Sequence, residues 1–97
     1  MENLEYNNVV LNIDNEDVYL TDESGEEYSG EIEGNVVTFW ITDIEDPYNN
    51  FEFPKVFEQI LEAGGEYSLS GDGFEYEMDI KIDLDILKKL YTVENNI

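Results

Sequence analysis

The sequence contains no cysteine, no histidine and no arginine. Without cysteine, the chain cannot form disulfide bonds, thiolate zinc sites or a cysteine nucleophile. Without histidine, it lacks the commonest metal ligand and the side chain that titrates near neutral pH. Without arginine, it has no bidentate clamp for phosphate groups. Catalysis or metal binding would therefore depend on carboxylates, amides, hydroxyls and lysines.

Positive charge is nearly absent as well. Four lysines face 25 aspartates and glutamates, which gives a formal net charge of −21. All four lysines follow Pro54, so residues 1–54 carry no basic side chain. Lysine pairing can absorb only a few of the carboxylates, and the others must face water or a partner. Because a net charge of roughly 2–8 keeps a small domain soluble, the excess indicates a basic partner that this charge attracts.

Long hydrophobic runs are also missing. No apolar stretch approaches the roughly 20 residues that span a bilayer, and the N-terminal residues lack the basic and apolar regions of a signal peptide. Anionic membranes and nucleic acids would repel the chain. We therefore expect a cytoplasmic protein that contacts neither a membrane nor nucleic acid directly. The hydrophobic content of 41% and aromatic content of 13% are nevertheless typical of a folded domain.

Residues 1–97 are expected to form a single domain. Alternating or β-branched stretches predict six strands, at 9–13, 17–21, 27–33, 36–42, 66–70 and 74–83. The segment between the fourth and fifth of these strands, Asp43–Asn50, is expected to be a loop. We expect Trp40, Phe39, Phe57 and Phe74 to lie in the hydrophobic core.

Two helices are predicted in addition. Pro54 and the apolar residues that follow it predict a first helix that ends at Gly64-Gly65. A second helix is expected from Leu84 to Tyr91, with Asp83 or Asp85 as its N-cap, and residues 92–97 as a frayed tail. The fold class predicted from these elements is α+β, an antiparallel sheet of about five or six strands with two short helices packed on one face.

The clearest candidate for a binding surface is the strand at 74–83. Its apolar residues alternate with charged ones, so Glu75, Glu77 and Asp79 point to one face, followed by Lys81 and Asp83. Successive outward side chains stand roughly 6.6–6.8 Å apart on a strand, a spacing comparable with that of phosphates along a nucleic-acid strand. Such a row could occupy a site that normally neutralises phosphates. The alternative is the solvated face of an amphipathic strand.

Two acidic loops are further candidates for contact with a basic partner. The first contains Asp22, Glu23, Glu26 and Glu27, joined by Glu31 and Glu33. The second contains Asp43, Glu45, Asp46 and Tyr48. Carboxylates beside tyrosine suit a groove rich in arginine and lysine, because arginine also stacks on aromatic rings. Solvated loops without a partner would show the same composition.

Metal binding and catalysis are weakly supported. The stretch at 14–17 lacks the glycine of a calcium-binding loop, and the stretch at 22–27 has its glycine in the wrong place. With 25 carboxylates, a pair at any chosen separation is expected, so carboxylate pairs do not indicate a glycosidase. We expect no cofactor, no dedicated metal site and no enzymatic activity.

In character, the chain resembles the small acidic DNA-mimicking anti-CRISPR proteins of bacteriophages. The shared features are the length, the cation-free residues 1–54, the acidic row Glu75-Glu77-Asp79 and the α+β pattern. The resemblance implies an inhibitor, a monomer or small homo-oligomer in the host cytoplasm, that blocks the basic DNA site of a CRISPR-type nuclease. Two alternatives remain open: an immunity protein that neutralises a cognate bacterial nuclease toxin, and an acidic regulatory subunit of a basic partner.

Overall fold

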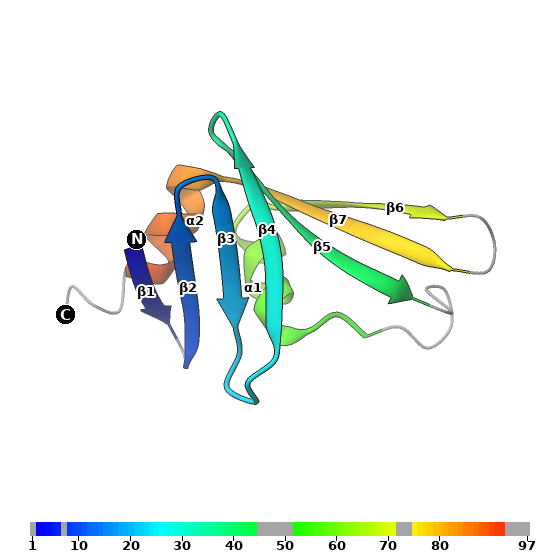
Figure 1. Cartoon of the computed structure of the whole chain (residues 1–97), viewed down its shortest axis with the longest axis horizontal. Helices are drawn as coiled ribbons and strands as arrows, with labels where there is room; N and C mark the ends of the chain where they lie inside the picture. The colour runs from blue at the N-terminus through cyan, green and yellow to red at the C-terminus, as the bar shows by residue number, and fades with distance from the viewer. Residues whose placement is uncertain (1, 7, 45–51, 72–74, 93–97) are drawn as a thin grey trace.

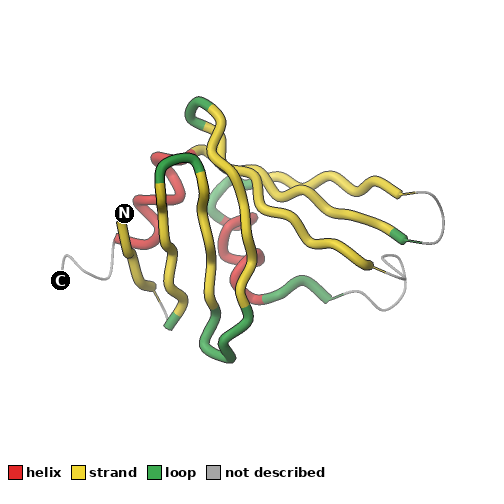
Figure 2. The backbone as a smooth tube through the Cα atoms, in the orientation of Figure 1, coloured by secondary structure: helices red, strands yellow, loops and turns green. Residues whose placement is uncertain are grey.

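The computed structural model describes residues 2–6, 8–44, 52–71 and 75–92. Seven antiparallel strands form one sheet in the order β1-β2-β3-β4-β5-β7-β6 (Figures 1 and 2). The strands are β1 (Glu2–Tyr6), β2 (Val9–Asp14), β3 (Asp17–Thr21), β4 (Glu27–Glu33), β5 (Val36–Ile44), β6 (Glu66–Gly71) and β7 (Tyr76–Asp83). The helices are α1 (Lys55–Glu62), between β5 and β6, and α2 (Leu84–Thr92), after β7. In this described part, no helix is long and apolar enough to cross a membrane.

The predicted fold class was wrong, because the structure is mostly sheet and the sheet has seven strands instead of five or six. The strand missing from the prediction is β1, whose sequence ENLEY is too polar to indicate a strand by itself. It forms because Leu4 lies opposite Leu11 of β2 and Tyr6 stacks edge-on against Tyr91 of α2. These contacts are distant in sequence, so no local pattern reveals them.

Element ends also differ from the prediction. Strand β5 continues to Ile44, so Asp43 belongs to a strand and not to the predicted loop, whereas residues 45–50 lie outside the described part. Pro54 is the N-cap of α1 and not its first helical residue. Thr92 is the last residue of α2, and the rest of the predicted tail, 93–97, is not described.

The sheet has one buried face and one open face. Alternation along each strand points Leu11, Val18, Leu20, Phe39 and Ile80 to the same side, where none of them is exposed to solvent. Both helices lie on this side (Figure 1). They complete the core with side chains that are themselves buried, namely Val56, Phe57, Ile60, Leu87 and Tyr91.

Phe57 of α1 contacts both β4 and β5. These two strands pair only from Gly30↔Phe39 to Glu33↔Val36, and beyond these positions they diverge (Figure 1). The centroid of the Phe57 ring is 4.9 Å from that of Tyr28 on β4 and 5.8 Å from that of Phe39 on β5. Such tilted and edge-on contacts are favourable for aromatic rings, so α1 holds the two parts of the sheet together.

Gly30 allows β4 to approach β5 where the pairing begins. A Cβ at this position would lie 2.8 Å from Phe39 Cδ1 and 2.9 Å from Val18 Cγ2, and it would also collide with the Thr38 carbonyl oxygen. A larger residue would push the strands apart. The glycine therefore permits the close pairing that places Glu31 and Glu33 beside β5.

The predicted core aromatics divide between the two faces. Phe39 and Phe57 are fully buried, as predicted. Trp40 is the neighbour of Phe39 in β5, so it points to the open face and the prediction for it was wrong. Phe74 lies outside the described residues.

Tyr91 is a buried tyrosine on α2. The side chain is fully buried under β1, its ring centroid is 6.1 Å from that of Tyr6, and Oη has no hydrogen-bond partner among the described residues. Burial, with a smaller contribution from Tyr6, raises the pKa of this hydroxyl far above its usual value. An unsatisfied buried hydroxyl costs about 1–3 kcal/mol relative to a satisfied one.

Replacing Tyr91 with phenylalanine should therefore leave stability unchanged or raise it. We expect Tyr91→Phe to change the free energy of unfolding, measured by urea denaturation, by between zero and about +1 kcal/mol. The exposed Tyr67 provides the control, since Tyr67→Phe should have no effect. A loss of more than about 1 kcal/mol in Tyr91→Phe would show that the hydroxyl has a partner.

Candidate functional site

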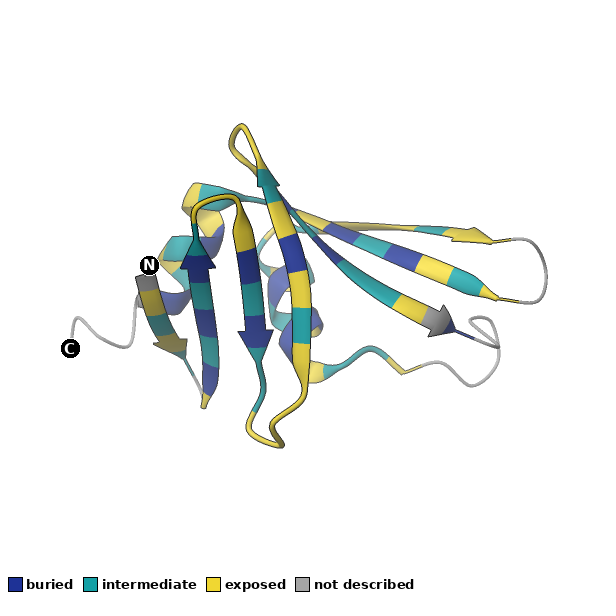
Figure 3. Ribbon diagram, viewed as in Figure 1, coloured by how far each residue is buried: buried dark blue, intermediate teal, exposed yellow. Residues whose placement is uncertain are grey.

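The open face of the sheet is the surface on which acidic side chains gather. We define it as the side opposite the two helices. None of the described side chains that point to it is buried (Figure 3). Its carboxylates, identified from strand alternation and register, are Glu5, Asp14, Asp17, Glu27, Glu31, Glu33, Glu66, Glu77, Asp79 and Asp83. Lys81 is the one basic residue among the described positions of this face.

Three of these carboxylates lie directly beside one another. The register pairs Asp14 with Asp17 and Asp17 with Glu31, so the three residues form a row across β2, β3 and β4. We call it the acidic row. Neighbouring strands are about 4.8 Å apart, and like charges in directly opposed positions destabilise a sheet. The row continues on β5, β7 and β6 as Thr38, Lys81 and Glu66.

The carboxylates of the predicted row on residues 74–83 do not all play the same part in the structure. Glu77 and Asp79 point to the open face of β7, and Glu75 is exposed just before the strand begins. Asp83, in contrast, forms hydrogen bonds within the protein. Its Oδ1 accepts hydrogen bonds from the backbone N–H of Asp85 (2.9 Å) and Ile86 (3.2 Å), and its Oδ2 accepts one from Asn35 Nδ2 (2.6 Å). Asp83 is thus the N-cap of α2.

The first predicted acidic loop is organised by one of its own carboxylates. Asp22 Oδ1 accepts hydrogen bonds from Ser24 Oγ (2.6 Å), Ser24 N (3.0 Å) and Glu26 N (3.0 Å). The Ser24 hydroxyl, supported by backbone N–H groups, holds the pKa of Asp22 below its usual value. Glu23, Glu26 and Glu27 are exposed, and Glu27 begins β4 on the open face. Asp22 therefore shapes the loop, while its neighbours present their charge to solvent.

The second predicted acidic loop is described only at its first residue. Asp43 lies in β5, next to the irregularity in the pairing of β5 with β7 between Ile41 and Ile44. Glu45, Asp46 and Tyr48 lie outside the described residues.

Trp40 marks a part of the open face that sequence reasoning missed. It lies opposite Asp79 in the register of β5 and β7. A shallow hollow of about 140 Å³ surrounds it and is lined by Glu31, Glu33, Thr38, Trp40, Asp79 and Lys81. We call it the Trp40 hollow. The signal was present in the sequence, because strict alternation around the core residues Val37 and Phe39 requires Trp40 to point outward.

A second hollow adjoins the first. It measures about 210 Å³ and is lined by Glu66, Tyr67, Ser68, Asp79 and Lys81. Asp79 and Lys81 line both hollows and so separate them. Lys81 forms no ion pair with the residues that the structure describes, although Glu66 lies opposite it in the register. The two hollows together place the Trp40 ring, several carboxylates and the Lys81 ammonium group on a small area of the sheet.

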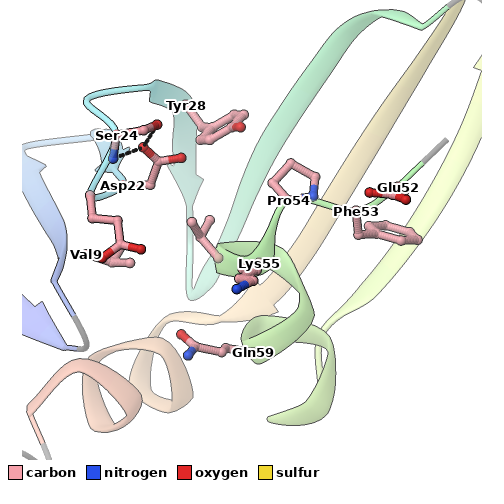
Figure 4. Close-up of a pocket in the computed structure, with 11 residues that line it drawn as sticks. Val9, Asp22, Ser24, Tyr28, Glu52, Phe53, Pro54, Lys55 and Gln59 are labelled. Atoms are coloured by element: carbon pink, nitrogen blue, oxygen red, sulfur yellow. Dashed lines mark hydrogen bonds between the residues drawn. The ribbon is translucent and has the colours of Figure 1, made fainter.

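A larger cavity of about 540 Å³ lies on the helix side, between the β3–β4 loop and the start of α1 (Figure 4). Val9, Tyr28, Phe53, Pro54 and Val56 form its apolar walls. The charged residues around it are Asp22, Glu23, Glu52 and Lys55. Carboxylates, a lysine and the N-terminus of α1 face the same space, so this cavity does not select for one sign of charge.

Neither metal ligation nor a known relative defines the site. Among the described residues, no group of three or more acidic side chains is arranged to hold a metal ion. Comparison with family models, with curated proteins and with solved structures found no match. The open face is therefore the candidate site because of the chemistry of its side chains alone.

The role of Asp83 can be tested with variants that distinguish its N-capping hydrogen bonds from its negative charge. We expect Asp83→Ala to lower the free energy of unfolding by about 1–2 kcal/mol, because α2 loses its cap. Asp83→Asn keeps a capping oxygen without the charge and should retain most of the stability. Glu77→Ala removes an equal charge from the exposed face of the same strand and should change it by less than about 0.5 kcal/mol. Equal unfolding free energies for Asp83→Ala and Glu77→Ala, measured by urea denaturation, would contradict the capping role.

Proposed function

We propose that this protein inhibits a nuclease effector of the CRISPR type by occupying its basic nucleic-acid site as a DNA mimic, with the open face as the docking surface. One observation carries the proposal. The face that the described helices leave uncovered presents carboxylates from several neighbouring strands, with Lys81 as its one described basic residue.

Electrostatics supports a partner with dense positive charge. The 25 acidic residues and four lysines leave most carboxylates without an internal counter-charge. At physiological ionic strength, their field acts over about 8 Å before salt screens it. A groove that neutralises phosphates with lysine and arginine would gain the same release of counterions from these carboxylates. The long-range attraction would also speed the encounter.

The acidic row supports the proposal because its carboxylates lower the stability of the free protein. Asp14, Asp17 and Glu31 repel one another across adjacent strands, and each such pair destabilises the free protein by up to about 1 kcal/mol. A basic partner removes this repulsion on binding. Positions that weaken the fold and favour a complex are expected in a binding surface.

The arrangement of charge is compatible with mimicry of a nucleic acid. Carboxylates repeat along β7 at Glu77 and Asp79, roughly 6.6–6.8 Å apart, and across β2 to β4 at about 4.8 Å. A duplex likewise carries closely spaced charges, about one for every 1.7 Å of its axis when both strands are counted. The open face presents carboxylates both along a β-strand and across neighbouring β-strands, whereas the predicted row on one β-strand would present them in one direction only.

Competition with DNA is the direct test of this proposal. The protein is added to purified RNA-guided nucleases either before or after their target DNA, and DNA binding and cleavage are measured. We expect inhibition only when the protein is added before the DNA. The affinity for the nuclease should fall about tenfold or more between about 50 and 200 mM salt.

Two results would contradict mimicry. One is equal binding of the protein to a nuclease that already holds its DNA, and the other is an affinity independent of salt. Inhibition of a bacterial nuclease toxin, without inhibition of any RNA-guided nuclease, would favour an immunity protein instead. A basic partner that binds in a salt-dependent manner and keeps its activity would favour a regulatory subunit.

Charge removal from the acidic row should separate binding from stability. We expect the double variant Asp17→Asn/Glu31→Gln to raise the free energy of unfolding at low salt by up to about 1 kcal/mol and to weaken nuclease binding about tenfold or more. The matched control is Glu58→Gln/Glu62→Gln on α1. It removes two like charges four residues apart on exposed helix positions, so it should also stabilise slightly.

The control defines what this comparison measures. Both double variants remove two negative charges, so a difference between them reports where the partner docks. Equal losses of affinity would show that the partner responds only to net charge and would contradict the open face as the docking surface.

A further inference from the structure

We propose that the Trp40 hollow binds an arginine side chain of the basic partner, stacked on the Trp40 ring and paired with a carboxylate beside it. This inference rests on the proposed function, because it takes a basic protein partner as given. It adds to the proposed function that the partner contacts one particular place on the open face, and that it does so with an arginine rather than a lysine.

Trp40 occupies an unusual position in the sheet. Pairing between β4 and β5 ends at Gly30↔Phe39, one residue before Trp40, so the described register places no β4 residue beside it. On the opposite side, Asp79 is its register partner. The ring is half-buried on a face whose other described residues are mainly polar or charged. Tryptophan on such a face adds apolar area that the core does not use.

The residues around Trp40 match the guanidinium group. Arginine stacks on an indole ring through a cation–π contact, which is strongest for tryptophan among the aromatic residues. Its planar fork of N–H donors can then bind a carboxylate with two hydrogen bonds. Asp79, Glu31 and Glu33 line the same hollow as the ring. A lysine would supply the charge, but its compact and strongly hydrated ammonium group gains less from the ring.

Lys81 weakens the binding of cations at this place. It lines the hollow with Trp40 and Asp79 and lies two residues from Asp79 on the same face of β7. Its ammonium group repels arginine and lysine alike, so it does not distinguish between them. The preference for arginine comes from the ring and the bidentate contact, and removal of the Lys81 charge reports whether a cation binds beside it.

Trp40 is the single tryptophan of the chain, so its fluorescence reports on this place alone. The wild-type protein is titrated with peptides of eight arginines and of eight lysines, and binding is measured in parallel by calorimetry. We expect the arginine peptide to change the Trp40 emission and to bind about fivefold more tightly than the lysine peptide. The lysine peptide should bind in a salt-dependent manner with little change in emission.

Variants test which side chains carry the preference. Trp40→Leu should lose most of the preference for the arginine peptide, because only the bidentate contact with a carboxylate remains. Lys81→Gln should tighten binding of the arginine peptide by about threefold more than Lys55→Gln does. The two lysine variants remove the same charge, and Lys55 lies on α1, on the other side of the sheet. Because Lys81 is exposed, its replacement keeps the test available should Trp40→Leu fail to fold.

The outcomes separate this inference from the proposed function. Equal affinities for the two peptides in the wild-type protein, with unchanged Trp40 emission, would overturn the arginine site and leave the proposed function standing. Failure of both peptides to bind at low salt would contradict the proposed function itself. An equal effect of Lys81→Gln and Lys55→Gln would show that the arginine peptide does not bind beside Lys81 and would overturn the Trp40 hollow as its site.

Discussion

Uncompensated negative charge is the constraint on which the rest of this structure depends. With four lysines for 25 acidic residues, most carboxylates must stay in water, because an unpaired buried charge would be far too costly. Strand alternation meets this requirement by sending carboxylates to one face and apolar side chains to the other. A sheet of this kind can be covered on one side only, which explains why both helices lie on the same face.

Because only one face of the sheet is covered, two short helices must hold the seven strands together. Helix α1 does so with Phe57, whose ring contacts Tyr28 of β4 and Phe39 of β5. Helix α2 does so with Tyr91, which packs under β1. On the opposite face, the pairing of β4 with β5 ends one residue before Trp40. The hollow that Trp40 lines lies over the paired residues Glu31 and Thr38 and over Asp79 and Lys81 of β7.

Sequence patterns predicted the individual elements better than their arrangement. Alternation at 74–83 correctly placed Glu77 and Asp79 on one outward face, but β1 was missed because its stabilising contacts come from Leu11 and Tyr91. The acidic row could not be predicted either, since it exists only through the register of β2, β3 and β4. The outward position of Trp40 could have been predicted, because Trp40 follows the core residue Phe39 directly in the same strand.

The carboxylates of this protein are not equivalent, and the difference bears on function. Asp22 and Asp83 accept hydrogen bonds from backbone N–H groups, so their charge supports a loop and a helix and would be kept for the fold alone. Asp14, Asp17 and Glu31 oppose one another, and a neutral or basic residue at Asp17 would relieve both repulsive pairs at once. Lys81, which follows in the same row, shows that the sheet accommodates a basic side chain. The acidic row is therefore the part of the charge that the fold does not explain, and it lies on the same face as Trp40.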